Sequence, residues 1–244
     1  MNQTIDLLMS HMSIRKFKEK NIEEEKVRAI IEAGQWAATS SHFQAYSIIN
    51  VQDPHKRQLL AEVTGGQKWV TECPLFLVFC ADLHRGKTSW EGFDPKVFGN
   101  TEMFIMATVD AALAAQKAFI AAQSLGLGGV YIGGIRNDLR KVSEILGLPE
   151  LVYVVFGMCL GYPDEDPGLK PRLPLEVVYK TDSYDESTDA ERIAAYNKVV
   201  RQYYLDRTDG KTKDTWSERC GRNMMAKTRD EIGEFLRSKG FCKK

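Results

Sequence analysis

The sequence predicts a single large domain, or one domain with an appendage, in which helices alternate with strands of a buried sheet. Two continuous apolar runs, residues 75–80 and 151–160, have the length of strands that are covered on both faces. A nearly apolar helix, residues 101–126, lies between them in the chain. Alternation of helices and strands typically gives a parallel sheet, so the pattern alone favours an α/β arrangement.

Composition is that of a globular protein with a sizeable core, because 43% of the 244 residues are hydrophobic. Thirty-three basic residues balance thirty-three acidic ones, which argues against a protein that works on nucleic acid or on an anionic membrane. The N-terminus lacks the features of a signal peptide, and the five cysteines include no C-x-x-C pair. We therefore expect a cytoplasmic protein with free thiols and, since the histidines lack ligand spacing, no metal.

The helix of residues 101–126 is the element on which the rest of the fold is expected to pack. Its polar residues recur about every seven positions and form one narrow stripe that includes Asp110, so the other sides are expected to be enclosed. A membrane span is the alternative, but each charge near its centre, Asp110 or Lys117, would cost roughly 2.5 to 3.5 kcal/mol. Its many alanines allow close approach of a neighbour, either a helix of the same chain or a partner subunit.

Periodicity and capping signals predict the other elements. Further strands are expected at residues 47–51 and 130–135. Residues 82–100 are polar and contain turn formers, so an irregular connection is expected there. From residue 183 the chain is more polar and has the pattern of an appended helical excursion. Helices are expected at residues 5–9, 21–38, 54–64, 137–146, 193–203 and 232–236.

Two short basic segments far apart in the sequence are candidates for one phosphate site. His11, Ser13 and Arg15 lie near the N-terminus, whereas Lys170 and Arg172 lie beside prolines that keep the backbone extended. If the segments converge, the cations can neutralise a phosphate while Ser13 supplies a directional donor. The alternative is two unrelated solvated faces.

The apolar strand near residue 130 contains Gly133 and Gly134, whose main-chain N–H groups a flat ligand could approach closely. A bulge or bend is the alternative. Gly126, Gly128 and Gly129, which precede this strand, close a helix and enter the strand, so they do not form the G-x-G-x-x-G dinucleotide fingerprint. The sequence also contains no nucleophile elbow and no phosphate-binding P-loop, so acyl transfer and nucleotide hydrolysis lose support.

Seven segments resemble the FMN-dependent nitroreductases of the oxygen-insensitive, NADPH-preferring group. In chain order they are HMSIRKF, TSSHFQAYSII, GGQKWV, LGLGGVYIGGIRND, FGMCLGYP, LKPRLP and YYLDRTDGKTKDTWS, and the resemblance covers almost the whole chain. It implies an α+β fold with a mainly antiparallel central sheet flanked by helices, instead of the parallel sheet that the pattern favours. It also implies an intertwined homodimer, with residues 1–182 as the FMN-binding core and 183–244 as a helical excursion that contributes to the NADPH or substrate site and to the dimer.

The resemblance further implies the residues of the site. Arg15 would face the pyrimidine end of the flavin, where a cation stabilises the reduced ring, and Arg207 would bind the 2′-phosphate of NADPH. Met12 departs from the family, which commonly has arginine there. The set implied for FMN is His11, Met12, Ser13, Arg15, Thr39, Ser40, Gln67, Lys68, Tyr131, Ile132, Gly133, Gly134, Lys170 and Arg172. The set implied for NADPH or substrate is Ser41, His42, Phe43, Arg207, Lys211, Lys213 and Arg229.

The implied activity is a ping-pong reaction in which NADPH delivers hydride to FMN and an acceptor then takes its place. Nitroaromatics, quinones and free flavin are the expected two-electron acceptors, and no side chain is an obligatory acid or base. One alternative is an NADPH:FMN reductase that supplies reduced flavin to a partner. An alternative from another class is a C-terminal nucleic-acid-binding module, which the interleaved acidic residues disfavour. Its basic residues would be Arg207, Lys211, Lys213, Arg222, Lys227 and Arg229.

Overall fold

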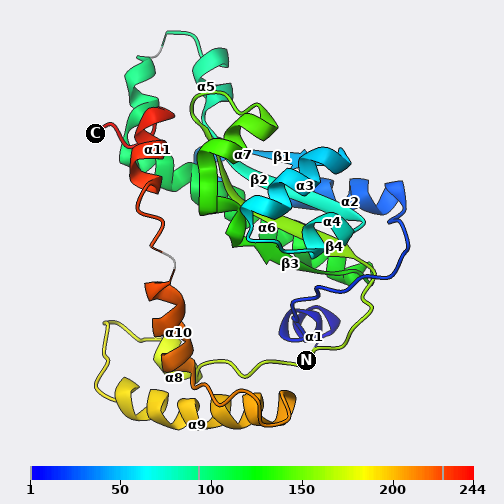
Figure 1. The fold of residues 1–244 in the computed structure, drawn as a ribbon. Helices are drawn as coiled ribbons and strands as arrows, with labels where there is room; N and C mark the ends of the chain where they lie inside the picture. The colour runs from blue at the N-terminus through cyan, green and yellow to red at the C-terminus, as the bar shows by residue number, and fades with distance from the viewer. Residues whose placement is uncertain (1, 93, 227) are drawn as a thin grey trace. The chain divides into compact units, whose positions relative to one another are not determined.

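A computed structural model describes residues 2–92, 94–226 and 228–244 of the chain (Figure 1). The chain divides into two compact units, one formed by Met1–Pro167 together with Arg229–Lys244 and the other by Gly168–Thr228. The chain therefore leaves the first unit once and returns to it for its last residues. Both crossing points differ from the boundary predicted between residues 182 and 183, and the functions assigned to either side of that boundary stay predictions.

The first unit is built on a four-stranded sheet in which all neighbouring strands are antiparallel. The α+β fold with an antiparallel sheet is thus confirmed, and the parallel sheet that alternation alone favoured is wrong. Two helical segments separate β1 from β2, and two separate β3 from β4, so each connection brings the chain back in the opposite direction. The strand order is β1 (Tyr46–Asn50), β2 (Leu75–Asp82), β4 (Val152–Gly161) and β3 (Gly128–Ile132).

β2 lies at the centre of the core because both of its faces are covered. All of its residues are buried, as the continuous apolar run predicted. Leu77 and Phe79 belong to a cluster with Phe119 of α6 (Thr101–Ser124). Phe76, which points to the other face, belongs to a cluster with Leu60 of α3 (Pro54–Val63).

α6 packs on the sheet and on α2 (Glu24–Gln35), and its buried face makes it a core helix of the first unit, although its length and mean hydropathy of 1.4 would also suit a membrane span. The helix is less enclosed than predicted. Ile105, Val109 and Leu113 follow one another at four-residue spacing and are 49%, 49% and 46% exposed. Asp110, predicted on the polar stripe, is instead buried.

The shorter elements correct three further predictions. Residues 82–100 contain two short helices instead of an irregular connection. The strand predicted to residue 135 ends at Ile132, where the two glycines begin a 3-10 helix, and the helix predicted from residue 137 begins at Leu139 with Asp138 as its N-cap. The remaining elements of this unit are α1 (Gln3–Met9), η1 (Ser40–His42), α4 (Trp69–Glu72), α5 (His84–Ser89), η2 (Pro95–Gly99), η3 (Gly133–Asp138), α7 (Leu139–Leu146) and α11 (Ile232–Ser238).

The second unit is helical and consists of α8 (Leu175–Val178), α9 (Asp189–Arg207) and α10 (Trp216–Met225). α9 buries Tyr196 and Val200, and the Tyr196 hydroxyl donates to the Pro171 carbonyl at 2.9 Å. A capping box of Thr215 and Glu218 begins α10. These contacts fix α9 and α10 as the framework of the unit.

Candidate flavin and nicotinamide site

The N-terminal segment that contains His11 and Ser13 is fixed against the glycine-rich strand β3. Ser13 forms a parallel bridge with Gly129, and the Ile14 N–H donates to the Gly129 carbonyl at 2.8 Å. Gly128 is needed for this approach, because a Cβ there would lie 2.6 Å from the Ile14 side chain. The predicted phosphate ligands of this segment therefore sit on an ordered backbone.

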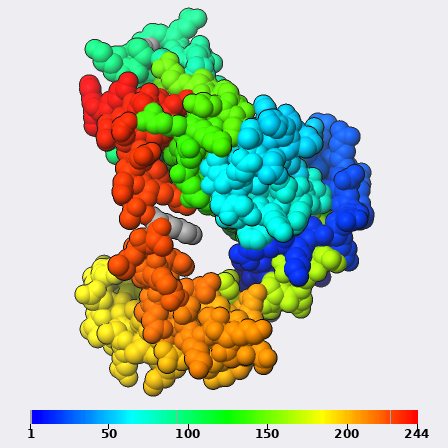
Figure 2. Space-filling model, in the orientation of Figure 1, coloured from blue at the N-terminus to red at the C-terminus, as the bar shows by residue number. Residues whose placement is uncertain are grey.

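Arg15 lies beside the start of α4. Its N–H and that of Lys16 donate to the same Glu165 oxygen at 2.6 and 3.1 Å, which fixes the main chain here. The Arg15 guanidinium lies 5.7 Å from the centre of the Trp69 ring, and the N-terminal chain runs beside the α3–α4 segment on one face of the unit (Figure 2). Trp69 Nε1 is buried and has no hydrogen-bond partner among the described residues, so a donor stays available next to the cation.

Gly133 and Gly134 follow β3 and differ in what surrounds them. A Cβ on Gly134 would lie 2.9 Å from Gln67 Nε2 and 3.0 Å from the Thr64 carbonyl oxygen, so packing requires this glycine. A Cβ on Gly133 would meet its nearest neighbour, Arg136, only at 3.9 Å, and Gly133 does not have a left-handed φ. Since neither packing nor backbone conformation requires Gly133, its missing side chain leaves room for a flat ligand against the main chain.

Tyr131 directs its ring away from this turn and into the core. The ring stacks on Phe119 at 5.3 Å, and the hydroxyl donates to Gln116 at 3.1 Å. Burial raises the pKa of Tyr131 well above its usual value. Ile132 is also buried. Both residues can therefore offer a ligand their main chain but not their side chains, and their place in the predicted FMN set stays a prediction.

Two arginines, Arg136 and Arg229, lie close to each other near Gly133. Arg229 donates to the Gly133 carbonyl at 3.1 Å and to Asn137 Oδ1 at 3.0 Å. Arg136 donates to the Val155 carbonyl, and the pKa of Arg136 is lowered first by burial and then by the charge of Arg229. Arg229 is among the residues implied for NADPH or substrate, whereas Arg136 was not predicted, although it follows the two glycines in one of the quoted segments.

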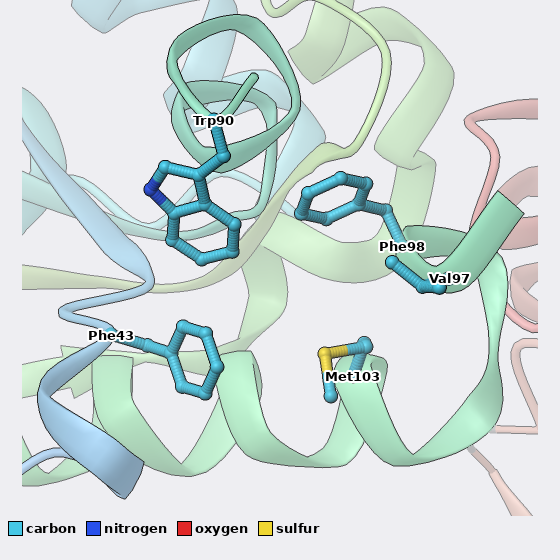
Figure 3. A pocket seen from close by; sticks show the side chains of 5 residues that line it. All are labelled: Phe43, Trp90, Val97, Phe98 and Met103. Atoms are coloured by element: carbon cyan, nitrogen blue, oxygen red, sulfur yellow. The ribbon is translucent and has the colours of Figure 1, made fainter. Parts of the chain in front are cut away.

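Residues 39–44 form a loop whose backbone is strained. Ser41, His42 and Gln44 have φ values of 45°, 61° and 52°, in the left-handed region that disfavours residues other than glycine. Ser41 and His42 are exposed, whereas the Phe43 ring turns inward and lies 5.2 Å from that of Trp90. The apolar pocket there has a volume of about 510 Å³ and is lined by Phe43, Trp90, Val97, Phe98 and Met103 (Figure 3).

The other predicted residues of the first unit lie close to these features. Gln67 Nε2 donates to the Thr64 carbonyl at 3.2 Å, and the exposed Lys68 follows on the same loop. Met12 is half-buried within the fixed N-terminal segment. The Thr39 hydroxyl accepts the Gln44 N–H at 3.4 Å.

The remaining predicted cations belong to the second unit. Arg172 donates to the Lys170 carbonyl at 2.9 Å, and Arg207, at the end of α9, donates to the Tyr203 hydroxyl at 2.5 Å. Lys211 and Lys213 follow on the exposed loop after α9. Convergence of Lys170 and Arg172 with the N-terminal segment stays a prediction. Lys227, one of the basic residues considered for nucleic-acid binding, lies outside the described residues.

Comparison of the sequence with protein families identifies the chain. The model described as "Nitroreductase family" matches residues 8–162, and that described as "Nitroreductase family, C-terminal domain" matches residues 170–244. The chain belongs to the nitroreductase family. This nitroreductase is 42% identical over 248 residues to the FMN reductase (NADPH) of Bacillus subtilis (strain 168), and 42% identical over 245 residues to the NADPH-flavin oxidoreductase of Vibrio harveyi. In both comparisons all of both chains is covered.

Solved structures agree with this assignment. The nitroreductase superposes on NfrA1 nitroreductase from B. subtilis with a TM-score of 0.96 at 41% identity, covering 99% of this chain and 100% of the other. It superposes on the NADPH:FMN oxidoreductase from Vibrio harveyi, solved in complex with NAD+, with a TM-score of 0.90 at 41% identity over all of both chains. The similarity therefore extends over both units of the nitroreductase.

Proposed function

We propose that this nitroreductase is an FMN-dependent NADPH oxidoreductase that passes two electrons at a time to small-molecule acceptors such as nitroaromatics, quinones or free flavin. The observation that carries the proposal is the open main chain at Gly133, with Arg136 and Arg229 beside it. The names of full-length relatives support it, since these are FMN reductase (NADPH), NADPH-flavin oxidoreductase and oxygen-insensitive NADPH nitroreductase.

The residues of the chain fit a bound flavin and have separate tasks. When bound, FMN supplies the chemistry that accepts and donates hydride. Gly133 would leave the main chain open to the ring, and Arg15 would supply a positive charge that stabilises the negative charge of the reduced flavin. His11 and Ser13, together with Lys170 and Arg172, would hold the phosphate.

A second copy of the chain is the proposed partner, and the cytoplasm is the proposed location. Ile105, Val109 and Leu113 form an apolar stripe along α6 that the first unit does not cover. An aligned set of large exposed hydrophobic side chains is typical of a protein interface. Thr39, Ser40 and Ser41 would reach the flavin of the second copy.

NADPH is the proposed electron donor because Arg207, Lys211 and Lys213 gather at the end of α9. Arg207→Ala is expected to raise the KM for NADPH about tenfold and to leave the KM for NADH nearly unchanged, because only NADPH carries a 2′-phosphate. Steady-state kinetics with both donors measure this. Arg201→Ala is the matched control, since Arg201 lies on the same helix and pairs with Glu218 at 3.6 Å. An equal rise of the KM for NADPH and for NADH in Arg207→Ala would contradict the assignment of Arg207 to the 2′-phosphate.

The proposed function is tested by the visible spectrum of the purified protein before and after anaerobic addition of NADPH. A flavin spectrum that bleaches on addition is the expected result. A protein that stays colourless after incubation with FMN and desalting would contradict the proposal.

A second candidate function is release of the reduced flavin to a partner, which the names FMN reductase (NADPH) and NADPH-flavin oxidoreductase of two relatives favour. Anaerobic desalting of the NADPH-reduced protein distinguishes the two, because released flavin would leave the protein fraction colourless after reoxidation. A nucleic-acid-binding role has less support, since Asp214 pairs with Arg222 at 2.5 Å and with Arg219 at 3.6 Å.

A further inference from the structure

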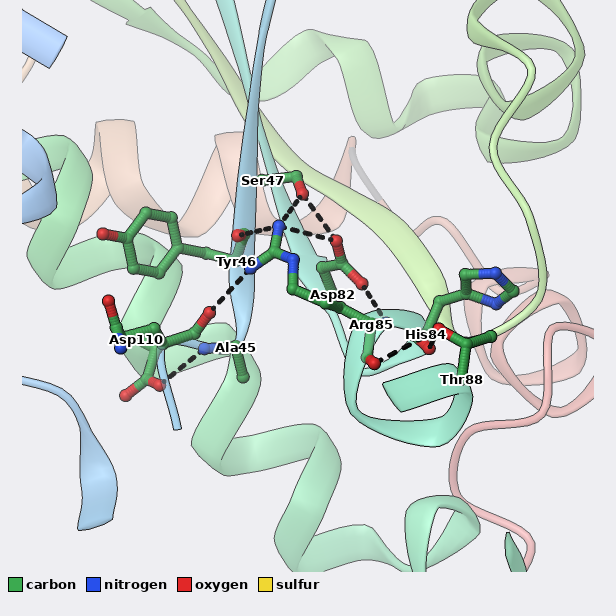
Figure 4. A network of polar contacts seen from close by, with 9 residues as sticks. Ala45, Tyr46, Ser47, Asp82, His84, Arg85, Thr88 and Asp110 are labelled. Carbon is green, nitrogen blue, oxygen red and sulfur yellow. Dashed lines mark hydrogen bonds and ion pairs between the residues drawn. The ribbon is translucent and has the colours of Figure 1, made fainter. Parts of the chain in front are cut away.

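Asp110 of α6 is a buried carboxylate with two main-chain partners. Its residue is 1% exposed, and a buried charge needs hydrogen bonds to offset its lost hydration. Oδ1 accepts the Ser40 N–H at 3.0 Å, and Oδ2 accepts the Ala45 N–H at 3.1 Å. Figure 4 shows the carboxylate directed at Ala45 from the neighbouring helix. Each oxygen thus holds one end of the strained loop.

Packing of the loop against the core does not explain its strained backbone. Ser41, His42 and Gln44 have left-handed backbone, which costs free energy for each of them. Ser40, Ser41 and His42 are nevertheless exposed, so no buried contact of their side chains fixes this shape. Conformations of this kind persist only where surrounding contacts hold them, and they cluster at functional sites.

A second set of contacts holds the carbonyl groups at the C-terminal end of the loop. Arg85 donates to the Gln44 and Tyr46 carbonyls, both at 3.3 Å. Its guanidinium also donates to the Ser47 hydroxyl at 2.9 Å and to Asp82 at 3.4 Å (Figure 4). The carboxylate of Asp110 therefore fixes N–H groups at both ends, while Arg85 fixes carbonyl groups at one end.

We propose that Asp110 is a positioning residue of the flavin and substrate site. It holds the loop in the shape in which Ser40, Ser41 and His42 present their polar groups to the ligands. This inference rests on the proposed function, which assigns those residues to that site. The charge is essential to the role, because a carboxylate accepts both N–H groups, whereas an amide accepts one and directs a donor at the other.

The test compares Asp110→Asn with Thr108→Val in the full-length protein. Thr108 lies on the same helix, and its hydroxyl contacts that of Tyr153 at 2.6 Å, away from the loop. Hydrogen exchange of the amides of residues 40–45, the Kd for FMN from fluorescence quenching, and Tm are measured for both variants. If Asp110→Asn leaves about a tenth of the molecules with the competent loop, the apparent Kd rises about tenfold.

The expected result is faster exchange of the loop and weaker FMN binding in Asp110→Asn, with both unchanged in Thr108→Val even if Tm falls equally. Wild-type exchange and Kd in Asp110→Asn would overturn the inference. If Asp110→Asn does not fold, Asp110→Ser replaces it, since a single hydroxyl oxygen cannot reach both N–H groups. Exchange and Kd equal to wild type in Asp110→Ser would then overturn the inference. Failure of the proposed function is separate, because wild-type protein would then neither bind FMN nor bleach with NADPH.

Discussion

Gly133 and Gly134 are adjacent and chemically identical, yet the surroundings give them different tasks. Gly134 is packed against Gln67 and Thr64, whereas the space beside Gly133 is open. A glycine in close contact with its neighbours contributes to the stability of the fold. A glycine with open space beside it and an ordinary backbone conformation allows a ligand to approach the main chain. The sequence could not separate the two, because the difference comes from Thr64 and Gln67 of a distant segment.

Alanine at these two positions is expected to give opposite results. Gly133→Ala should leave the free energy of unfolding within about 0.5 kcal/mol of wild type and raise the FMN Kd about tenfold or more, because the methyl group occupies the approach to the main chain. Gly134→Ala should lose about 1 to 3 kcal/mol, because its Cβ overlaps a carbonyl oxygen. Urea unfolding and fluorescence titration measure both quantities. Wild-type FMN affinity in Gly133→Ala would show that the flavin lies elsewhere.

The residues of the candidate site differ in how far the sequence alone could identify them. Arg15 and Gly133 were named from segments with a recognisable pattern, whereas Arg229 was named only as one of a set of basic residues near the end of the chain. The role of Asp110 in holding the loop was not predicted, because polar residues that recur every seven positions are also typical of the solvent-exposed face of a helix. Its hydrogen-bond partners lie 65 and 70 residues away in the chain. Trp69 was missed because an unpaired indole N–H is visible only once the packing around it is known.

The start of α2 is joined to the end of β4 by a compact polar contact. The Tyr162 hydroxyl donates to Glu23 at 2.5 Å, and Lys20 and Lys26 pair with the same carboxylate at 3.1 and 3.3 Å. The hydrogen bond from Tyr162 is the largest of the effects that lower the pKa of Glu23 to about 2. α2 has no side-chain hydrogen bond at its N-cap, so this contact fixes its first turn.

Glu23 is expected to stabilise the protein in a pH-dependent way. A carboxylate with a depressed pKa contributes stability above its unfolded value of about 4.5, and this contribution is lost as pH falls towards about 2. Glu23→Gln should therefore lower Tm at pH 7, with a difference from wild type that shrinks between pH 4.5 and 2. Thermal unfolding across this range measures the difference. Glu25→Gln, an exposed change on the same helix, serves as control, and a Tm difference independent of pH would contradict the assignment.

Elements were easier to predict than their pairing. The apolar run of β2 and the long α6 stood out because burial on several sides removes polar residues from the sequence. The antiparallel direction of the strands could not be predicted from the pattern. It depends on how the two helical segments between neighbouring strands return the chain, and helices alternate with strands in parallel and antiparallel sheets alike. Only the resemblance of the segments to a family gave the correct sheet.

At the scale of the whole molecule, the exposed apolar stripe of α6 is expected to form the interface of a dimer. Leu113→Asp places a charge at the C-terminal end of the exposed stripe, where a second copy would have to desolvate it. Sedimentation should then show a monomer that retains its far-UV spectrum but loses FMN on desalting. Glu144→Lys, an exposed change on α7 and outside the stripe, should remain a dimer with bound flavin. A Leu113→Asp protein with wild-type mass in solution would exclude the stripe as the interface.

The return of the chain to the first unit after residue 228 determines when that unit can be completed during synthesis. Phe241 is fully buried and lies 5.4 Å from Tyr153 and 5.9 Å from Phe104. The Leu151 N–H donates to the Lys239 carbonyl at 2.7 Å. A nascent chain that has already released all four strands still exposes this aromatic surface, because its cover comes from residues 229–244. The core of the first unit therefore closes only after residues 168–228 of the second unit have been made, and until then the unfinished surface is a target for chaperones.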